Sequence, residues 1–228
     1  MKLHWSPRSP FVRKVMIALH ELGLVDRLDY VRSPVRMTAP PNPEVIADNP
    51  LCKIPTLVMD DGTALFDSRV IITYLVSLAP EQSLIPAEFD ARLRDMRWEA
   101  FGDGLLDVLL LWRTEELRGT CKDQVVCQGF DAKVRASLTQ LNREAHSLGA
   151  ARFGTGHIAI VCALGQLDFR YADCGWRGAF PALADWYDGV SVRRSLRETA
   201  VVDDNALDMG DIKMPLRFVP APAPERDR

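Results

Sequence analysis

The first eighty residues alternate between short apolar runs and apolar residues at helical spacing. Short β-like runs occur at residues 2–5 and 28–32, and the segment 9–23 between them has helical periodicity. Its apolar positions recur at i, i+3, i+4, i+7 and i+10: Val12, Val15, Met16, Leu19 and Leu22. Gly23 suits the left-handed conformation that ends many helices. The pattern therefore predicts a strand, a helix that ends at Gly23, and a second strand.

A second group of elements follows a proline-rich stretch. Residues 32–45, RSPVRMTAPPNPEV, contain four prolines and are predicted to form a loop without regular structure. Residues 56–66 have two short β-like runs around the turn sequence DDG, which is typical of a β-hairpin. A helix is predicted over 67–78, before Pro80. The order predicts a small mixed sheet covered by helices, and it contains neither of the glycine-rich nucleotide-binding motifs.

From about residue 89 the apolar spacing is helical throughout. The positions that line the first long helix are Leu93, Met96, Phe101, Leu105, Leu109 and Trp112. A second helix is predicted over 126–141, and residues 158–169 are nearly all apolar, as expected of a central buried helix. Two shorter helical runs follow at 181–189 and 192–199.

The change of periodicity near residue 80 predicts two domains. The fold class is α/β followed by all-α, with a first domain over 1–79, a linker over 80–88 and an all-helical domain over 89–202. The remaining residues, 203–228, end in PLRFVPAPAPERDR. This proline-rich tail is expected either to wrap the surface or to stay disordered.

Composition excludes several classes of protein. The chain has 228 residues, of which 47% are hydrophobic and 26% charged, as in an ordinary globular protein. The net charge of −3 lacks the basic excess that nucleic-acid binding requires, so no nucleic-acid partner is expected. The most apolar stretch, 105–112, contains Asp107 and is far shorter than the ~20 residues of a membrane span. No membrane association and no signal peptide are therefore expected.

The cysteines indicate a reducing compartment. They are odd in number, widely spaced and without a CxxC pair: Cys52, Cys121, Cys127, Cys162 and Cys174. This spacing does not fit a zinc site, and no metal is expected. Free thiols in a chain of this size favour a cytoplasmic location.

One segment with candidate chemistry lies at the predicted turn between the first strand and the first helix. It reads SPRSPF, residues 6–11. Ser9 is either a plain N-cap followed by Pro10, or a hydroxyl beside a helix N-terminus. In the second case the backbone N–H groups and the helix dipole would favour an anion such as a thiolate.

Two further segments offer similar alternatives. In NPLCKIPTL, residues 49–57, the Ile54–Pro55 bond is either an ordinary trans bond or a cis bond that presents the Ile54 backbone to an extended peptide. In LFDSR, Asp67 or Ser68 either caps a helix or binds a ligand. In the latter case Ser68 would take a carboxylate and Asp67 an ammonium group.

Together and in this order, the three segments resemble the cytosolic glutathione S-transferase family. SPRSPFVRKV, NPLCKIPTLV and LFDSRVIITYL are similar to its serine loop, cis-proline loop and acidic-Ser helix start, and PALADWYDGVSVRRSLRET is similar to its penultimate helical region. The resemblance covers about residues 1–200 and is closest to bacterial serine-type members related to the theta, zeta and delta classes. It implies a thioredoxin-like first domain, βαβ-ββα, and an all-helical second domain. It also implies a homodimer that detoxifies electrophiles with glutathione as co-substrate and without a metal.

The resemblance implies a role for the serines. Ser9 would hydrogen-bond the glutathione sulfur and favour its thiolate, and Ser6, in the same loop, is the alternative. The thiolate would then attack an electrophilic small molecule or a peroxide.

Five further residues are implied to bind the rest of glutathione. The Ile54 backbone would pair with the cysteinyl part, held in place by cis Pro55. Lys53 would lie near the glycyl carboxylate. Asp67 and Ser68 would hold the γ-glutamyl ammonium and carboxylate.

The second substrate is expected between the domains. Its candidate pocket residues are Phe11, Trp98, Phe101, Leu105 and Trp112, although an aromatic stripe at helical spacing is also the pattern of a core.

The sequence departs from the family pattern at three places, one of which is Arg193-Arg194, where the family tends to have Arg-Pro. Cys52 stands where the family often has glycine, so its thiol either reacts or is packed away. The start of the central helix, Gly154-Thr155-Gly156-His157, lacks the usual acidic capping residue and is expected to be less stable by up to ~1 kcal/mol.

Glutathione transferase activity is therefore the leading function. The alternatives are a glutathione-dependent disulfide reductase that uses Cys52, and a non-catalytic glutathione-binding stress or interaction protein.

Overall fold

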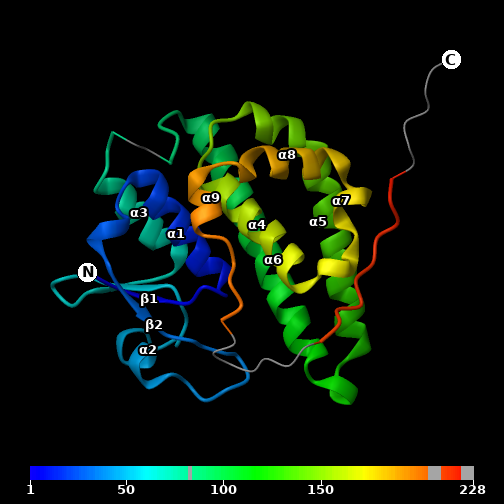
Figure 1. Ribbon diagram of the computed structural model, residues 1–228, viewed down its shortest axis with the longest axis horizontal. Coiled ribbons are helices and arrows are strands. Elements are labelled where there is room, and N and C mark those ends of the chain that lie inside the picture. The colour runs from blue at the N-terminus through cyan, green and yellow to red at the C-terminus, as the bar shows by residue number, and fades with distance from the viewer. Residues whose placement is uncertain (82–83, 205–211, 222–228) are drawn as a thin grey trace.

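The first domain is built on a small mixed sheet. The computed structural model of the chain describes residues 1–81, 84–204 and 212–221 (Figure 1). The strands are β1 (Lys2–Trp5), β2 (Asp29–Arg32), β3 (Thr56–Val58) and β4 (Ala64–Leu65), in the order β2-β1-β3-β4. β1 pairs in parallel with β2 and antiparallel with β3, and β3 pairs antiparallel with β4. The predicted mixed sheet and β-hairpin are confirmed.

Two helices of this domain begin and end as their sequence predicts. In α1 (Pro10–Leu22), Ser9 is the N-cap and Gly23 ends the helix with φ 67°, a value at which a side chain would be strained. In α3 (Ser68–Ser77), Asp67 is the N-cap. The apolar faces of the two helices and of the strands form one core, which includes Leu3, Val15, Leu19, Leu57, Ile71 and Leu75.

The structure corrects the predicted loop over 32–45. Its last residues belong to a short helix, α2 (Pro43–Asp48). The Asn42 side chain accepts hydrogen bonds from the N–H groups of Glu44 and Val45, at 3.0 and 3.4 Å. Pro43 stands at the first helical position, where the missing N–H has no partner to lose. The last of the four prolines therefore starts a helix instead of excluding one.

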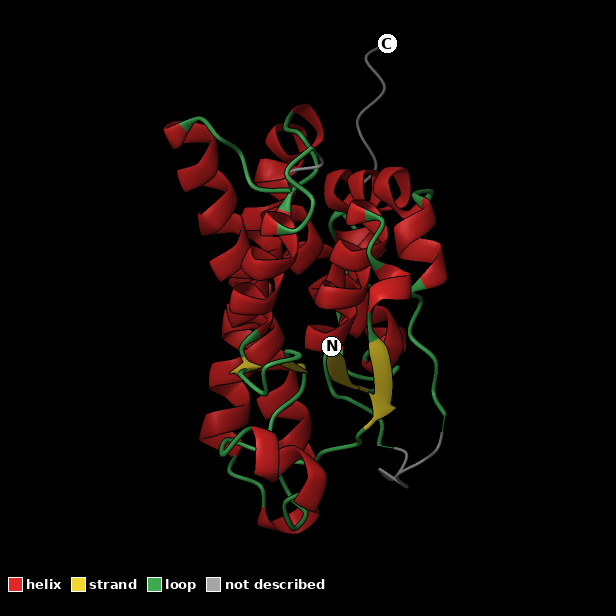
Figure 2. Ribbon diagram, turned by 90° about the vertical axis from the view of Figure 1, so that its left-hand side faces the viewer, coloured by secondary structure: helices red, strands yellow, loops and turns green. Residues whose placement is uncertain are grey.

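The second part of the chain is helical, as predicted. Its α-helices in the described residues are α4 (Phe89–Glu116), α5 (Gln124–Ala150), α6 (Thr155–Arg170), α7 (Trp176–Ala179), α8 (Pro181–Ser191) and α9 (Arg194–Glu198). Short 3₁₀ segments occur at Val25–Arg27, Gly119–Cys121 and Ala172–Cys174. Every residue from 155 to 167 is buried, so α6 is the central helix that the sequence predicts. In Figure 2 the strands are confined to one small sheet and helices make up most of the molecule.

α4 and α6 approach each other closely at two glycines. A Cβ on Gly102 would lie 2.5 Å from the backbone carbonyl carbon of Ala159. A Cβ on Gly156 would lie 2.5 Å from the backbone oxygen of Asp95. Because both neighbours are backbone atoms, they cannot move aside as a flexible side chain could.

This contact decides which face of α4 is buried. Trp98, Leu105, Leu109 and Trp112 share the face of Gly102 and are at most 2% exposed. Leu93 and Met96, which the sequence places in the same stripe, are 55% and 56% exposed because they lie outside that face. The expectation that Leu93 and Met96 line the buried face of this helix is therefore wrong.

The start of α6 obtains its acidic cap from another helix. Asp95 of α4 accepts hydrogen bonds from the Gly156 N–H at 3.1 Å and from the Thr155 hydroxyl at 2.7 Å. His157 Nδ1 accepts a hydrogen bond from the Gly154 N–H at 3.1 Å. The carboxylate that the local sequence lacks is therefore supplied by tertiary packing.

Part of the proline-rich tail packs against the helical domain. Met214 and Leu216 are buried in the core. The N–H of Phe218 donates to the Cys174 carbonyl at 2.8 Å, and the Arg135 guanidinium lies 4.8 Å from the centre of the Phe218 ring. Residues 212–221 therefore wrap the surface, whereas 205–211 and 222–228 of the predicted tail lie outside the described residues. In the described ranges no helix is long and apolar enough to cross a membrane.

Replacement of Gly102 tests the contact between α4 and α6. Gly102→Ala should lower the free energy of unfolding by about 1–3 kcal/mol, because the new methyl group overlaps backbone of α6. The control is Gly104→Ala, an exposed position of the same helix with open space around its Cβ. It should gain up to ~1 kcal/mol from helix propensity. Denaturant unfolding compares the two, and equal stability of both variants would contradict the contact.

Candidate functional site

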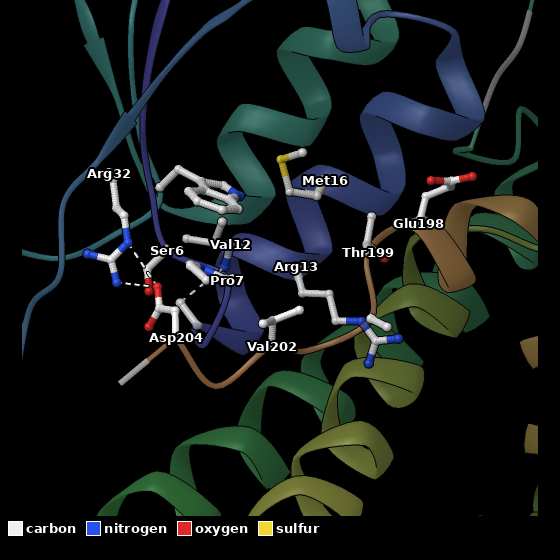
Figure 3. A pocket seen from close by; sticks show the side chains of 13 residues that line it. Ser6, Pro7, Val12, Arg13, Met16, Arg32, Glu198, Thr199, Val202 and Asp204 are labelled. Carbon is white, nitrogen blue, oxygen red and sulfur yellow. Dashed lines mark hydrogen bonds and ion pairs between the residues drawn. The ribbon is translucent and has the colours of Figure 1, made fainter. Parts of the chain in front are cut away.

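The two candidate serines lie at the turn between β1 and α1 and line one pocket. Ser9 Oγ accepts a hydrogen bond from the Val12 N–H at 3.3 Å, which makes Ser9 the N-cap. Ser6 is buried, and its Oγ lies 3.4 Å from the Arg8 N–H that donates to it. The pocket has a volume of about 330 Å³ (Figure 3). Both serines therefore face the same space, with Ser9 the less buried of the two.

The other walls of this pocket come from α1, β2 and the chain after α9. Val12, Arg13 and Met16 of α1 line it together with residues 198–200, 202 and 204. Arg32 at the end of β2 and Asp204 lie toward each other across the rim in Figure 3, and the Arg32 Nε–H donates to Asp204 at 2.8 Å. The segment after α9 therefore covers one side of the space beside the serines.

The loop before β3 has the cis bond that one of the two sequence alternatives requires. The Ile54–Pro55 peptide is cis. Asn49 holds the loop, because its side chain donates to the Lys53 carbonyl at 3.2 Å and to the Thr56 hydroxyl at 2.9 Å. In the described part of the chain, the backbone N–H and C=O of Ile54 make no hydrogen bond to another residue. The backbone N–H and C=O of Ile54 therefore form an open backbone edge, which an extended peptide could pair with.

The first two candidate segments are brought together by an apolar contact. Val12, in the first turn of α1, Val45 of α2 and Ile54 form one buried cluster. Trp5 and Met16, which also line the serine pocket, pack against it. The open edge of Ile54 therefore lies next to the start of α1.

The third segment, at the start of α3, holds a paired carboxylate. Asp67 accepts from the Arg69 backbone N–H at 3.0 Å and from its guanidinium at 2.8 Å. Partial burial opposes ionisation of Asp67, but the hydrogen bonds from Arg69 outweigh it and lower the pKa of this carboxyl. Ser68 is 2% exposed. Capping by Asp67 is thus observed, and its charged form is favoured.

A buried ion cluster joins α1, α3 and α4. Lys14 is fully buried, and its Nζ lies 2.6 and 2.8 Å from the two carboxylate oxygens of Asp103 and 3.2 Å from Glu99. Arg69 approaches the same Asp103 at 3.9 Å. Burial raises the pKa of Asp103, and the Lys14 ammonium only partly offsets this. The sequence argument missed this cluster, although the i, i+4 spacing of Glu99 and Asp103 was a signal that both carboxylates share one face.

Asp107, one turn further along α4, connects the cluster to the glutathione-binding candidates. Partial burial raises the pKa of Asp107, while the positive charges of Lys53 and Arg69 act in the opposite direction. The negative charge of Asp67 also acts on it. These interactions bring the exposed Lys53 and the start of α3 to the same side of α4.

The structure corrects three of the five residues expected to line the second-substrate pocket. Trp98, Leu105 and Trp112 are at most 2% exposed because their face of α4 packs into the core. The indole N–H groups of Trp98 and Trp112 donate to Glu144 and Glu116, at 2.7 and 3.2 Å.

The remaining two, Phe11 and Phe101, are half-buried against the core and stay a prediction.

Cys52 is held toward α2. Its Sγ accepts a hydrogen bond from the Asn42 N–H at 3.2 Å, and the residue is half-buried with φ 49°. Within the ranges described, no three His, Cys, Asp or Glu side chains are grouped so that they could hold a metal ion.

Comparisons with known proteins agree with this geometry. The family model for the glutathione S-transferase N-terminal domain matches residues 8–78, and that for the glutathione S-transferase C-terminal domain matches 112–189. The chain is 31% identical over 206 residues to the uncharacterized GST-like protein YibF of Escherichia coli (strain K12), a match that covers 87% of this chain and 98% of YibF.

Two solved structures of glutathione transferase family members are also similar to this chain. The chain is 38% identical to a glutathione transferase family member from Pseudomonas fluorescens Pf-5 with bound glutathione, with a TM-score of 0.84 over 89% of this chain and 99% of that one. A structure of a family member from the same strain with bound S-(propanoic acid)-glutathione is also 38% identical, with a TM-score of 0.81 and the same coverage.

Removal of the buried lysine tests the ion cluster. Lys14→Met leaves Asp103 buried without its cation and should cost about 3–5 kcal/mol of unfolding free energy at pH 7.5. The loss should be smaller at pH 5. The folded-state pKa of Asp103 is already above the unfolded value and rises further without Lys14, so protonation at low pH relieves the penalty. Denaturant unfolding at both pH values measures this.

The double variant Lys14→Met with Asp103→Leu removes the stranded charge and should recover part of the loss. An equal loss at both pH values would show that the cost of Lys14→Met does not come from Asp103.

Proposed function

Because this chain belongs to the glutathione S-transferase family, we propose that it binds glutathione and stabilises its thiolate for attack on an electrophilic small molecule or a peroxide. The observation that carries the proposal is the open backbone edge of Ile54 beside the N-terminus of α1. An extended peptide can pair with that edge as a short strand would, and its cysteinyl sulfur would then lie toward Ser9. The glutathione complex of the Pseudomonas relative supports this choice of peptide.

Ser9 is the better candidate to meet the sulfur. Its Oγ accepts a hydrogen bond from the Val12 N–H, so the hydroxyl proton is available to donate to a thiolate. The same position receives the positive end of the α1 dipole. Ser6 is more deeply buried. A hydroxyl donor and a helix N-terminus aimed at one atom both favour the ionised form of that atom.

Residues of complementary charge are the candidates to bind the remaining groups of glutathione. Lys53 is exposed beside the loop and suits the glycyl carboxylate, and Pro55 fixes the loop that presents Ile54. Asp67, whose charged form is favoured, suits the γ-glutamyl ammonium, and the Ser68 end of α3 suits the γ-glutamyl carboxylate. Asp107 adds negative charge near the same ammonium.

The chemical step needs little beyond the thiolate and proximity. The sulfur forms a bond to the electrophilic carbon while the leaving group departs with its electron pair, which gives a thioether of glutathione. The S-(propanoic acid)-glutathione bound by the Pseudomonas relative is a thioether of this class. Phe11 and Phe101 are the candidates left to contact the electrophile.

Serine substitutions test the assignment. Ser9→Ala should lower the rate of conjugation to a chlorinated aromatic probe by on the order of 10²–10³-fold, as removal of an oxyanion donor does, and should raise the pKa of bound glutathione thiol. Glutathione binding, measured by calorimetry, should persist. The loss of the N-cap costs about 1 kcal/mol, so assays belong well below the unfolding temperature.

Ser6→Ala is the matched control and should retain conjugation. Loss of activity in Ser6→Ala but not in Ser9→Ala would reverse the assignment. If the wild-type chain binds glutathione but turns over no electrophile, the non-catalytic alternative holds. Disulfide reduction that is lost in Cys52→Ser would support the reductase alternative.

We further propose that the protein is a two-fold homodimer. Three large apolar side chains on the first turns of α4 are more than half exposed at i, i+4 and i+7: Phe89, Leu93 and Met96. Such a stripe on one helix face is typical of a surface that a second copy covers.

A charge in this stripe tests the dimer. The wild-type chain should sediment at twice its monomer mass at micromolar concentration, and Leu93→Glu should shift it to the monomer. Val125→Glu, at an apolar residue that is 76% exposed at the start of α5, is the control and should remain dimeric. A monomeric wild type would refute the proposal, and a dimeric Leu93→Glu would place the interface elsewhere.

A further inference from the structure

His157 is a buried histidine that joins the end of α5 to the start of α6. The residue is 2% exposed. Its Nδ1 accepts a hydrogen bond from the Gly154 N–H at 3.1 Å, and its Nε2 lies 3.0 Å from the Leu148 carbonyl oxygen. Gly154 is the N-cap of α6, and Leu148 belongs to the last turn of α5. One side chain therefore holds both sides of the connection over 151–154.

These two partners fix the protonation state of the ring. A backbone N–H can only donate and a backbone carbonyl can only accept, so His157 is neutral and carries its proton on Nε2. An imidazolium would have a second proton on Nδ1, directed at the Gly154 N–H. Two donors cannot share a hydrogen bond, so protonation of His157 breaks the bond to Gly154 and leaves a buried N–H without its acceptor.

Three aromatic rings pack around His157. The ring centres of Trp98, Phe153 and Trp186 lie 5.4, 5.5 and 6.1 Å from that of the imidazole. They exclude water from the ring, and an imidazolium here would lose most of its hydration. Burial is accordingly the main cause that lowers the pKa of His157 below its usual value.

Two charged groups of the described chain act on His157, and their effects oppose each other. Asp95 of α4 favours the imidazolium, whereas the Arg193 guanidinium disfavours it. Asp95 Oδ1 lies 3.8 Å from Nδ1, too far for a hydrogen bond. The Asp95 carboxylate already accepts from the Gly156 N–H and the Thr155 hydroxyl. Its attraction therefore does not outweigh burial, and the neutral ring remains favoured.

The segment that His157 holds is part of the contact between α4 and α6. It presents Thr155 and Gly156 to Asp95. The Thr155 hydroxyl also lies 3.2 Å from a carboxylate oxygen of Glu99, and Glu99 contacts the Lys14 ammonium at 3.2 Å. The start of α6 is thus joined both to His157 and to the buried ion cluster.

We propose that His157 makes the start of α6 acid-sensitive: the neutral side chain holds residues 151–157 against α4, and protonation releases them. A carboxylate cap in place of His157 would become protonated only at about pH 4. The histidine moves the response to acid into the range just below neutral pH. This behaviour follows from the fold and does not depend on the proposed function.

The response has a definite sign. Opening of the segment returns His157 to the usual histidine pKa of 6.5, which is higher than its pKa in the closed state. The open state therefore takes up more protons, and the closed state loses stability as the pH falls below about 7.5. Between pH 7.5 and pH 5.5 the equilibrium constant for opening should rise by up to about tenfold.

Hydrogen exchange on the wild-type full chain tests this response. After correction for the intrinsic exchange rate, the amides of residues 154–158 should lose at least about threefold of their protection between pH 7.5 and pH 5.5. The start of α1 is the internal control and should keep its protection, because its cap is the Ser9 hydroxyl, which does not titrate in this range.

His157→Gln separates the histidine from other groups that titrate nearby. Glutamine stays uncharged at both pH values, and its side-chain oxygen can accept from the Gly154 N–H as in a capping box. Its loss of protection at low pH should be at least about threefold smaller than that of the wild type. Asp95, whose pKa is raised by burial, is present in both proteins, so its titration cancels in the comparison. His146→Gln, at an exposed histidine of α5, is the matched control and should respond as the wild type does.

An equal loss of protection in the wild type and in His157→Gln would overturn the proposal, and so would wild-type protection that does not change with pH. If His157→Gln does not fold, nitrogen NMR of the wild-type imidazole rings decides. One ring that holds its proton on Nε2 at pH 7.5 and titrates below pH 6.5 is expected. A buried ring that is already cationic at pH 7.5 would overturn the proposal. None of these outcomes bears on glutathione binding.

Discussion

The burial of the Lys14 ammonium between two domains is the constraint on which the site depends. A fully buried cation is tolerated only with paired carboxylates, and here Asp103 and Glu99 of α4 supply them. α1 is thereby fixed to α4, and Ser9 at the start of α1 lies little more than one turn from the anchor. At the other end of α1, Glu21 pairs with Arg193 at 2.6 Å, just before α9. Held at both ends, α1 cannot tilt without breaking a buried or partly buried ion pair.

The charged side chains near α1 form two separate groups. Asp67, Asp103 and Asp107 gather where α3 meets α4, which suits an ammonium group. Arg8, in the turn before α1, and Arg170, at the end of α6, both form ion pairs with Asp203. The net charge of −3 shows neither group, because it sums 28 basic and 31 acidic residues over the whole chain. These ion pairs act over less than 4 Å, well within the ~8 Å at which salt screens exposed charges at physiological ionic strength.

Sequence was sufficient where local chemistry determines the structure and insufficient where packing does. The ends of α1 follow from Ser9 and Gly23, whose roles depend only on the adjacent backbone. The burial of Trp98, Leu105 and Trp112 depends on which face of α4 meets α6 at Gly102, and periodicity alone cannot choose between a core and a pocket. α2 was missed because a proline at the first position of a helix resembles a proline that breaks one. Contacts such as Asp95 with Thr155 join distant residues, and neither local sequence predicts its partner.

The chain after α9 connects stability to the site. Leu216 is fully buried against the helical domain, and Leu196 of α9 is 2% exposed, so the described chain is anchored on both sides of residues 203 and 204. Those two residues carry the carboxylates that meet Arg8, Arg170 and Arg32. The burial of Leu196 and Leu216 therefore holds this segment in place. Each ion pair needs to contribute little stability by itself. The same arrangement lets a segment without helix or strand line the pocket beside the serines.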